Sequence, residues 1–394
     1  MPTSSTTISA PEAGPFARHI PALDGVRGLA VLGVAGSHLF SATPHSALEA
    51  AIHNTLAFGA NGVDLFFVLS GFLITGILYD SLADPAFFRK FYARRVLRIF
   101  PLYYGVLAAF AIAALVLGLH FHGELLSLAL YLQNSNLIAP QIRSYAGPSP
   151  LPLSHFWSLA IEEQFYLAWP ITVFLLRKKR RLLLFCCAAL LLTPVLRFTL
   201  LLHGVNFFTI HTNTLCRADS LLAGATLALL LRTDLHDHAL RAGRWLFAAG
   251  LLASALMTAL VAFGLVTQTS TSFLFILAAN YSAMAAISAG LIAITLRPGL
   301  ISSFFSIKSM RWLGKYSYGI YVLHVIRFAY LEEPIRSLIQ LHLTPNKAAV
   351  VLLTGLLIFL LSLTAAYLSF NLYEKRFLRL KRFFDYRAHP NTAS

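Results

Sequence analysis

Ten apolar stretches of about 20 residues are the feature of this sequence that most restricts its fold. A helix rises about 1.5 Å per residue, so a stretch of this length crosses the roughly 30 Å hydrocarbon layer of a bilayer. Charged residues make up only 12% of the chain, against about 25% in soluble domains, and the mean hydropathy is +0.70. The sequence therefore predicts an all-α integral membrane protein with about ten transmembrane helices. The expected spans are residues 23–41, 58–79, 99–119, 154–176, 181–203, 214–231, 245–265, 273–296, 312–330 and 348–373.

The lysine and arginine residues between these spans indicate how the chain crosses the membrane. Alternate connections on one side carry 23 of them, whereas those on the other side carry three. Cytoplasmic loops hold the excess of positive charge in membrane proteins, so both termini are expected in the cytoplasm. The net charge of +15 is then a signal of topology, which disfavours binding to nucleic acid. The expected organisation is a disordered cytoplasmic N-terminus at 1–20, a polytopic transmembrane domain at 21–375 and a basic cytoplasmic tail at 376–394.

Two ionisable residues, Arg27 and His38, lie in the first apolar stretch. Such residues are costly in the hydrocarbon layer and usually mark a functional site or an ion pair. Eleven residues at about 100° each amount to about three turns plus 20°, so both side chains share one face of the helix, about 16 Å apart along its axis. An ion pair between Arg27 and Asp24 is an alternative, structural role. The pair of Arg27 and His38 predicts a site that is reached from both sides of the membrane.

The outer half of the predicted bundle gathers further ionisable residues. Glu162 and Glu163 are adjacent, so their side chains point about 100° apart and only one is expected to face the interior. Glu162 is the candidate, because it shares a face with His155. In an alternative interpretation these residues form ion pairs that hold the helices together, as Asp64 would with Arg217. The candidate residues of this outer constellation are His38, Asp64, His155, Glu162, Arg217 and Asp219.

A basic cluster precedes the third apolar stretch, at the end expected in the cytoplasm. Arg95 and Arg98 are one helical turn apart and share a face, and Arg94 lies beside them. Guanidinium groups bind phosphate through paired hydrogen bonds, so the cluster predicts a phosphate-bearing donor that enters from the cytosol. The alternative is a simple contact with anionic lipid headgroups. The motif HDH at 236–238 lacks a fourth ligand, and no metal site is expected.

Six motifs follow one another along the chain and together resemble the acyltransferase family 3 membrane proteins, which include bacterial polysaccharide O-acetyltransferases. The motifs are the Arg-x10-His of Arg27 and His38, GVDLFFVLSGFL, RRVLRIFP, FWSLAIEEQFYL, RADSLLAG and LGKYSYGIYVLH. The resemblance implies an acyl-CoA donor, acetyl-CoA in the first place, as a co-substrate and not a permanently bound cofactor. It also implies a hydroxyl acceptor, often a sugar, at the outer side. A multi-pass protein of a bacterial cytoplasmic (inner) membrane, surrounded by membrane lipids, is expected.

The resemblance also assigns roles to the candidate residues. It implies that His38 is the essential catalytic histidine and that Arg27 and the arginine cluster handle the donor. Imidazole suits this chemistry, because acyl transfer to an alcohol needs a base that titrates near neutral pH. The expected catalytic residues are His38, Arg27, Glu162, Asp64 and Asp24; the expected donor-binding residues are Arg94, Arg95 and Arg98; the expected substrate-binding residues are His155, Arg217 and Asp219.

The sequence therefore predicts a membrane-bound O-acyltransferase with His38 as the base. It would move an acyl group from cytoplasmic acyl-CoA to a hydroxyl of a cell-envelope glycan or another sugar-containing acceptor. Direct transfer and transfer through a covalent acyl-histidine both stay open. An alternative function also stays open, a polytopic transporter or flippase of an acyl or glycan substrate without catalysis.

Overall fold

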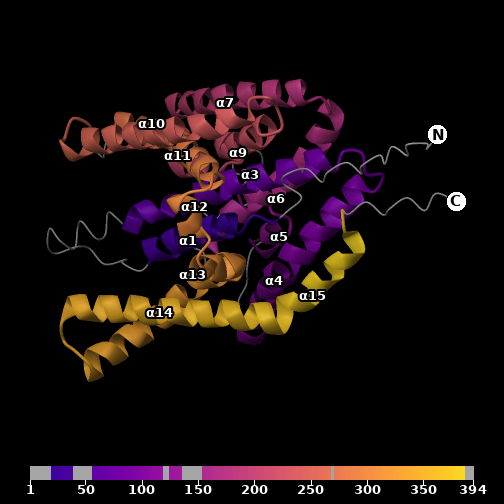
Figure 1. Ribbon diagram of the computed structural model, residues 1–394. Helices are drawn as coiled ribbons and strands as arrows, with labels where there is room; N and C mark the ends of the chain where they lie inside the picture. The colour runs from indigo at the N-terminus through magenta and orange to yellow at the C-terminus, as the bar shows by residue number, and fades with distance from the viewer. Residues whose placement is uncertain (1–18, 39–55, 119–123, 135–152, 268–269, 387–394) are drawn as a thin grey trace, which may run out of the picture.

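In the computed structural model of the chain, the described residues are 19–38, 56–118, 124–134, 153–267 and 270–386 (Figure 1). They form helices and connections, and none of them lies in a strand. The α-helices are α1 (Pro21–Ser37), α3 (Gly62–Asp80), α4 (Phe87–Leu117), α5 (Glu124–Ala129), α6 (Trp157–Leu176), α7 (Lys179–Leu202), α8 (Phe207–Thr212), α9 (Ala218–Leu230), α10 (His236–Ala262), α11 (Thr271–Thr295), α12 (Leu300–Phe305), α13 (Lys308–His342), α14 (Lys347–Ser369) and α15 (Lys375–Arg379). Shorter turns are the 3-10 helices η1 (Gly59–Asn61), η2 (Ser154–Phe156), η3 (Leu215–Arg217) and η5 (Leu380–Phe384) and the π-helix η4 (Phe370–Glu374).

The predicted N-terminal segment 1–20 lies almost entirely outside the described residues. The predicted basic tail is described as far as residue 386 and continues the helical path of the chain through α15 and η5.

Seven helical stretches of the described chain are long and apolar enough to cross a membrane. They are Leu56–Asp80, Phe87–Val116, Ser154–Leu176, Lys179–Leu202, His236–Ala262, Thr271–Thr295 and Ala349–Phe384. Three further expected spans, at 23–41, 214–231 and 312–330, are not among them. The helices there are α1 with 17 residues, α9 with 13 residues, and α13, which is long but carries charged side chains along its length. The described residues are thus all-helical, and their seven helices of spanning length identify a multi-pass membrane protein.

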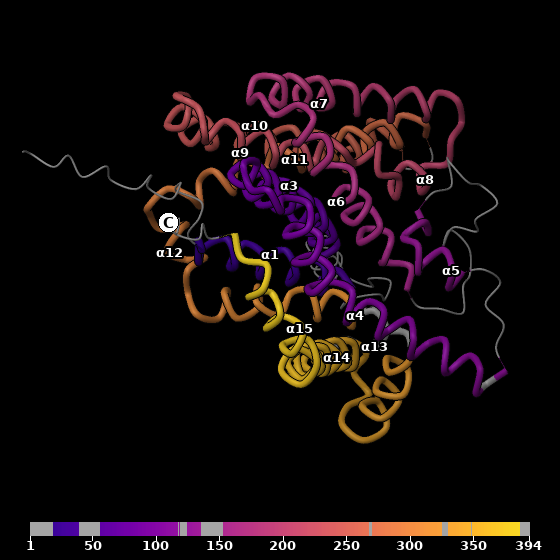
Figure 2. Tube along the Cα trace, turned by 90° about the vertical axis from the view of Figure 1, so that its right-hand side faces the viewer, coloured from indigo at the N-terminus to yellow at the C-terminus, as the bar shows by residue number. Residues whose placement is uncertain are grey.

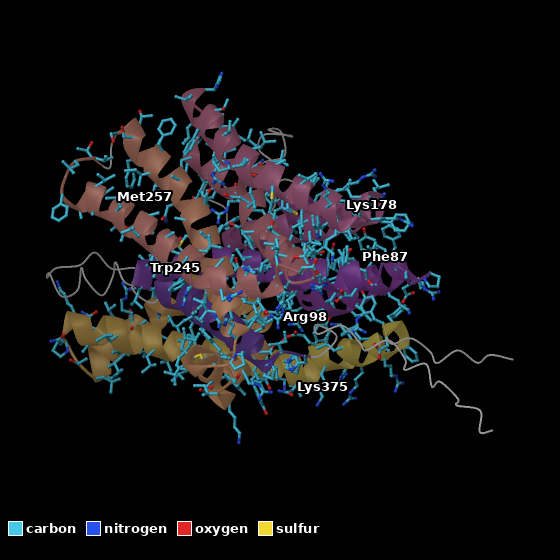
Figure 3. All side chains as sticks on the ribbon, turned by 45° about the horizontal axis from the view of Figure 1, so that its top comes forward. Phe87, Arg98, Lys178, Trp245, Met257 and Lys375 are labelled. Atoms are coloured by element: carbon cyan, nitrogen blue, oxygen red, sulfur yellow. The ribbon has the colours of Figure 1, made fainter. Side chains whose placement is uncertain are left out.

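The ends of the long helices alternate between two ends of the bundle. Phe87 begins α4 and Lys178 precedes α7, and both lie at the right-hand end in Figure 3. Met257, near the end of α10, lies at the opposite end. The basic connection at 177–181 and the start of the arginine-rich α4 therefore share one end of the bundle.

Helix α3 lies at the centre of the molecule, where it contacts α1, α6, α9 and α11 (Figure 2). Helices α7, α10 and α11 cover one side of this centre, and α13 and α14 cover the other. The side chains of Val68, Leu69 and Phe72 on α3 are almost completely buried between these layers. Such a position explains why α3 is apolar around its whole circumference and not along a single stripe.

Two glycines allow α3 and α9 to touch backbone to backbone. A Cβ atom on Gly71 would lie 1.8 Å from the carbonyl oxygen of Leu221, and one on Gly224 would lie 1.9 Å from the carbonyl oxygen of Val68. Membrane helices associate largely through packing, and small residues permit this close approach. Neither glycine can gain a side chain unless the two central helices separate.

We expect Gly71→Ala to destabilise the protein by about 1–3 kcal/mol, the usual cost of overpacking a tight core. Gly105→Ala is the matched control, because a Cβ on Gly105 meets its nearest atom, the hydroxyl oxygen of Tyr373, at an ordinary 3.5 Å. Thermal unfolding of both variants in detergent measures the difference. Equal melting temperatures for the two variants would contradict the close contact between α3 and α9.

Candidate active site

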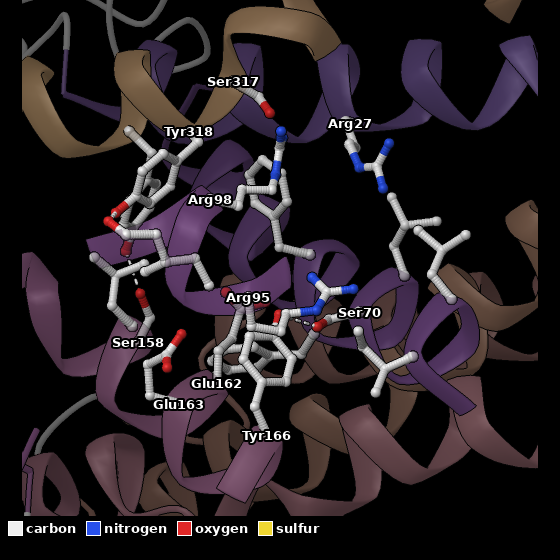
Figure 4. Close-up of a pocket in the computed structure, with 18 of the residues that line it drawn as sticks. Arg27, Ser70, Arg95, Arg98, Ser158, Glu162, Glu163, Tyr166, Ser317 and Tyr318 are labelled. Carbon is white, nitrogen blue, oxygen red and sulfur yellow. Dashed lines mark hydrogen bonds between the residues drawn. The ribbon is translucent and has the colours of Figure 1, made fainter. Parts of the chain in front are cut away.

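A cavity opens between α1, α3, α4, α6 and α13 (Figure 4). It encloses about 900 Å³, including space that is open to solvent. Apolar side chains of α3 form much of its wall. The polar side chains that line it are Arg27, Ser70, Arg95, Arg98, Ser158, Glu162, Glu163, Tyr166, Ser317, Tyr318 and Tyr321.

Three guanidinium groups face this cavity, Arg27 from α1 and Arg95 and Arg98 from α4. As the spacing predicted, Arg95 and Arg98 share one face of their helix. Arg27 donates a hydrogen bond of 2.6 Å to the carboxylate of Asp24. Within the described part of the chain, neither Arg95 nor Arg98 has a carboxylate oxygen within 4.0 Å. The three charges interact with one another, and their excess makes the cavity suited to an anion.

Aromatic and hydroxyl groups hold Arg95 in place. The guanidinium carbon of Arg95 lies 5.1 Å from the ring centroid of Tyr166 on α6 and 5.7 Å from that of Phe91 on its own helix. The hydroxyl of Tyr166 is hydrogen-bonded to that of Ser70 at 2.6 Å. Stacking of this kind leaves the edge of the guanidinium group available to a ligand.

Two carboxylates of α6, Glu162 and Glu163, also line the cavity. The expectation that only Glu162 would face the interior is therefore wrong. In Figure 4, Glu162 lies beside Arg95, and Glu163 lies toward Ser158. The cavity extends around more than one side of α6, so two side chains that point in different directions both reach it.

Arg94 points away from the cavity and holds the C-terminal segment. Its guanidinium group donates hydrogen bonds to the carbonyl oxygens of Lys381, at 3.2 Å, and Phe384, at 3.1 Å. It also lies over the ring of Tyr386, 5.3 Å from the centroid. Of the three arginines expected to bind the donor, two line the cavity and one anchors η5.

A cluster of three histidines lies at the end of α1. The ring centroids of His38 and His324 are 5.2 Å apart, and those of His324 and His155 are also 5.2 Å apart. Close contact of α1 with α13 brings the first two together, since a Cβ on Gly314 would lie 1.8 Å from the carbonyl oxygen of Asp24. Sequence reasoning placed His38 and His155 in one constellation but left His324 out of the candidate set.

Tyr321 connects the histidine cluster to the cavity. Its hydroxyl donates a hydrogen bond of 2.9 Å to the carbonyl oxygen of His155 and is hydrogen-bonded to Ser158, and both Tyr321 and Ser158 line the cavity. His38 itself is not among the lining residues. Two buried ring nitrogens of the cluster, Nδ1 of His155 and Nε2 of His324, have no hydrogen-bond partner among the described residues. In that part of the chain, no three His, Cys, Asp or Glu side chains are arranged to hold a metal ion.

The remaining expected residues form buried ion pairs at the other side of α3. Arg217 is paired with Asp64, which also accepts a hydrogen bond of 3.1 Å from Ser220. Asp219 receives two hydrogen bonds from Arg197, at 2.8 and 2.9 Å. None of these four charged side chains lines the cavity. They match the interpretation in which Asp64 and Arg217 hold the helices together.

Arg197 is a residue that sequence reasoning missed. It is fully buried on α7, where it also donates to the hydroxyl of Ser282 and the carbonyl oxygen of Cys216. An arginine in the interior of the apolar stretch 181–203, far from the basic residues at its start, was the signal that could have revealed it. The partner on α9 was not readable from the sequence.

Comparison with known proteins identifies the family of the chain. A family model described as an acyltransferase domain matches residues 20–370. The chain is 31% identical over 322 residues to the putative peptidoglycan O-acetyltransferase YrhL of Bacillus subtilis, covering 78% of the chain and 48% of the relative. It is 29% identical over 325 residues to the peptidoglycan O-acetyltransferase OatA of Listeria monocytogenes, covering 78% and 49%. The chain thus spans about half the length of these curated relatives, and no solved structure matches it.

The motifs that suggested acyl transfer all lie inside the matched region, which covers most of the chain and every residue lining the cavity. The protein belongs to acyltransferase family 3.

Proposed function

We propose that the protein moves an acyl group, acetyl in the first place, from a cytoplasmic acyl-CoA to a hydroxyl of a cell-envelope glycan. The names of its relatives, which describe peptidoglycan O-acetyltransferases, support a glycan acceptor. An acyl-CoA donor is supported by the cavity with three arginine side chains, because guanidinium groups bind phosphate groups well.

The proposed topology has about ten spans in the inner membrane of a bacterium, with α1, α9 and α13 added to the seven apolar helices and with both termini in the cytoplasm. The excess of lysine and arginine in alternate connections supports it. In this orientation Arg27 lies toward the cytoplasm and His38 toward the outer side. The donor then enters at the arginines, and its acyl group meets the acceptor near the histidine cluster.

In the proposed reaction, His38 is the general base. It accepts the proton of the acceptor hydroxyl as the oxygen attacks the thioester carbonyl carbon. A carbon–oxygen bond forms, the carbon–sulfur bond breaks, and the proton passes from the imidazolium to the departing thiolate of CoA. Transfer through an acyl-histidine would divide these steps in two. His324 packs against the ring of His38, and His155 packs in turn against His324.

The other expected residues act on the donor or on the scaffold in this proposal. Asp24 fixes Arg27 through their ion pair, and Glu162 offsets part of the positive charge beside Arg95. Two buried ion pairs hold α3, α7 and α9 together: Arg217 with Asp64, and Arg197 with Asp219. Removal of one partner from a buried pair strongly destabilises a protein, because the other charge is left unpaired. Catalysis is favoured over the transporter alternative by membership of the acyltransferase family.

We expect His38→Ala to lower acyl transfer by about 10²- to 10⁴-fold, the usual contribution of a general base, without unfolding the protein. The measurement is thioester consumption by detergent-purified protein that is given acetyl-CoA and a cell-envelope glycan extract. His203→Ala is the matched control, because His203 also caps a helix C-terminus and is exposed. Wild-type-like transfer by the His38 variant would exclude His38 as the base, and no consumption by the wild type would favour transport.

We expect Arg95→Ala to raise the KM for acetyl-CoA about tenfold or more, because a charged hydrogen bond to phosphate is lost. Arg89→Ala, an exposed arginine on the same helix, tests whether net charge alone matters. Initial rates over a range of acetyl-CoA concentrations give KM and kcat for each variant. If both variants change KM equally, the cavity is not the donor site.

A further inference from the structure

We propose that the C-terminal segment 380–386 forms part of the donor site and that the ammonium group of Lys381 binds the phosphates of the acyl-CoA. This inference rests on the proposed function, because it adds a residue to the site at which the donor would bind. It concerns a segment beyond residue 370, where the match to the family model ends. The segment therefore lies outside the matched acyltransferase domain.

The course of the chain carries the segment to the arginine cluster. After α14, the π-helix η4 interrupts the regular helical pattern, and α15 and η5 continue beside α4 (Figures 1 and 2). π-turns inside α-helices often occur at functional sites. The hydroxyl of Tyr373 in η4 donates a hydrogen bond of 3.2 Å to the carbonyl oxygen of Pro101 on α4. The turn thus docks the end of the chain on the helix that carries Arg95 and Arg98.

Arg94, which precedes Arg95 on α4, anchors the C-terminal segment to that helix. Its two hydrogen bonds go to the carbonyl oxygens of Lys381 and Phe384, so they hold the backbone and leave the ammonium group of Lys381 free of this contact. Tyr386 lies under the same guanidinium group. The backbone of η5 is therefore fixed at both of its ends, which orders Lys381 before any ligand binds.

The surroundings of Lys381 are strongly cationic. Its charge interacts with those of four arginines, namely Arg98, Arg95, Arg94 and Arg27. The acidic groups nearby are already engaged with those arginines: Asp24 pairs with Arg27, Glu162 and Glu163 act on Arg95, and Glu374 acts on Arg98. Among the described residues, Lys381 has no carboxylate oxygen within 4.0 Å.

Like charges held together in a partly buried place repel one another and destabilise the fold. A ligand with several negative charges would remove this repulsion, and coenzyme A carries a pyrophosphate and a 3′-phosphate. Arg27, Arg95 and Arg98 line the cavity, η5 packs on α4, and Arg94, next in sequence to Arg95, holds the backbone of Lys381. We therefore place the side chain of Lys381 at the cavity mouth. The segment would then select thioesters of coenzyme A over thioesters without phosphate.

The test compares two donors and three variants of the full-length protein in detergent. The donors are acetyl-CoA and acetyl-pantetheine, which has the same thioester arm but no phosphate. The variants are Lys381→Ala, Lys381→Arg and the control Arg382→Ala, in which an exposed cation of the same turn is removed. Binding of coenzyme A to the same variants in a His38→Ala background gives a readout that does not require turnover.

We expect Lys381→Ala to raise the KM for acetyl-CoA, and the Kd for coenzyme A, about tenfold with little change in kcat. Lys381→Arg should restore most of the affinity, Arg382→Ala should resemble the wild type, and acetyl-pantetheine should not distinguish any of them. An equal loss with both donors, or no loss with either, would overturn the role of Lys381. Neither result would contradict the proposed acyl transfer, which is contradicted instead if the wild-type protein consumes no thioester.

Discussion

The structure depends on how positive charge is accommodated inside an apolar bundle. A guanidinium group in a membrane interior must be paired, hydrogen-bonded or given access to water. The protein pairs some of its arginines with carboxylates and lets others face a cavity. Arg197 and Arg217 are buried against Asp219 and Asp64, and these pairs tie the central α3 and α9 to α7. Arg95 and Arg98 have no such partner in the described chain and face a cavity instead.

This division separates scaffold from site. In the two buried pairs each arginine is balanced by an aspartate, so the pairs carry no net positive charge for an anionic ligand. An arginine that rests on an aromatic ring keeps its donors available, and Arg95 on Tyr166 is arranged in this way. The charged residues of the bundle therefore form two sets on opposite sides of α3. The buried ion pairs hold helices together, and the arginines of the cavity are suited to bind an anion.

The cavity and the histidine cluster are distinct places joined by a short polar path. Tyr321 and Ser158 belong to the cavity wall, and the carbonyl of His155 accepts the hydrogen bond from Tyr321. A donor with a long flexible arm suits such an arrangement, because its charged end and its reactive end are bound at different depths. The proposal that acyl-CoA enters from one side and a glycan from the other fits this separation, and in that proposal the C-terminal segment completes the charged end.

The sequence alone determined the membrane class, the family and the local faces of single helices. Hydrophobic length and residue spacing are short-range properties, so the shared face of Arg95 and Arg98 was predictable. Tertiary structure decided everything that joins one helix to another. The partner of Asp219 is Arg197 on α7, the neighbour of His38 is His324 on α13, and Arg94 turns to η5. Helix packing makes these choices, and it also brought Glu163 into a cavity that extends around α6. The residue pattern within one helix does not predict these contacts between helices.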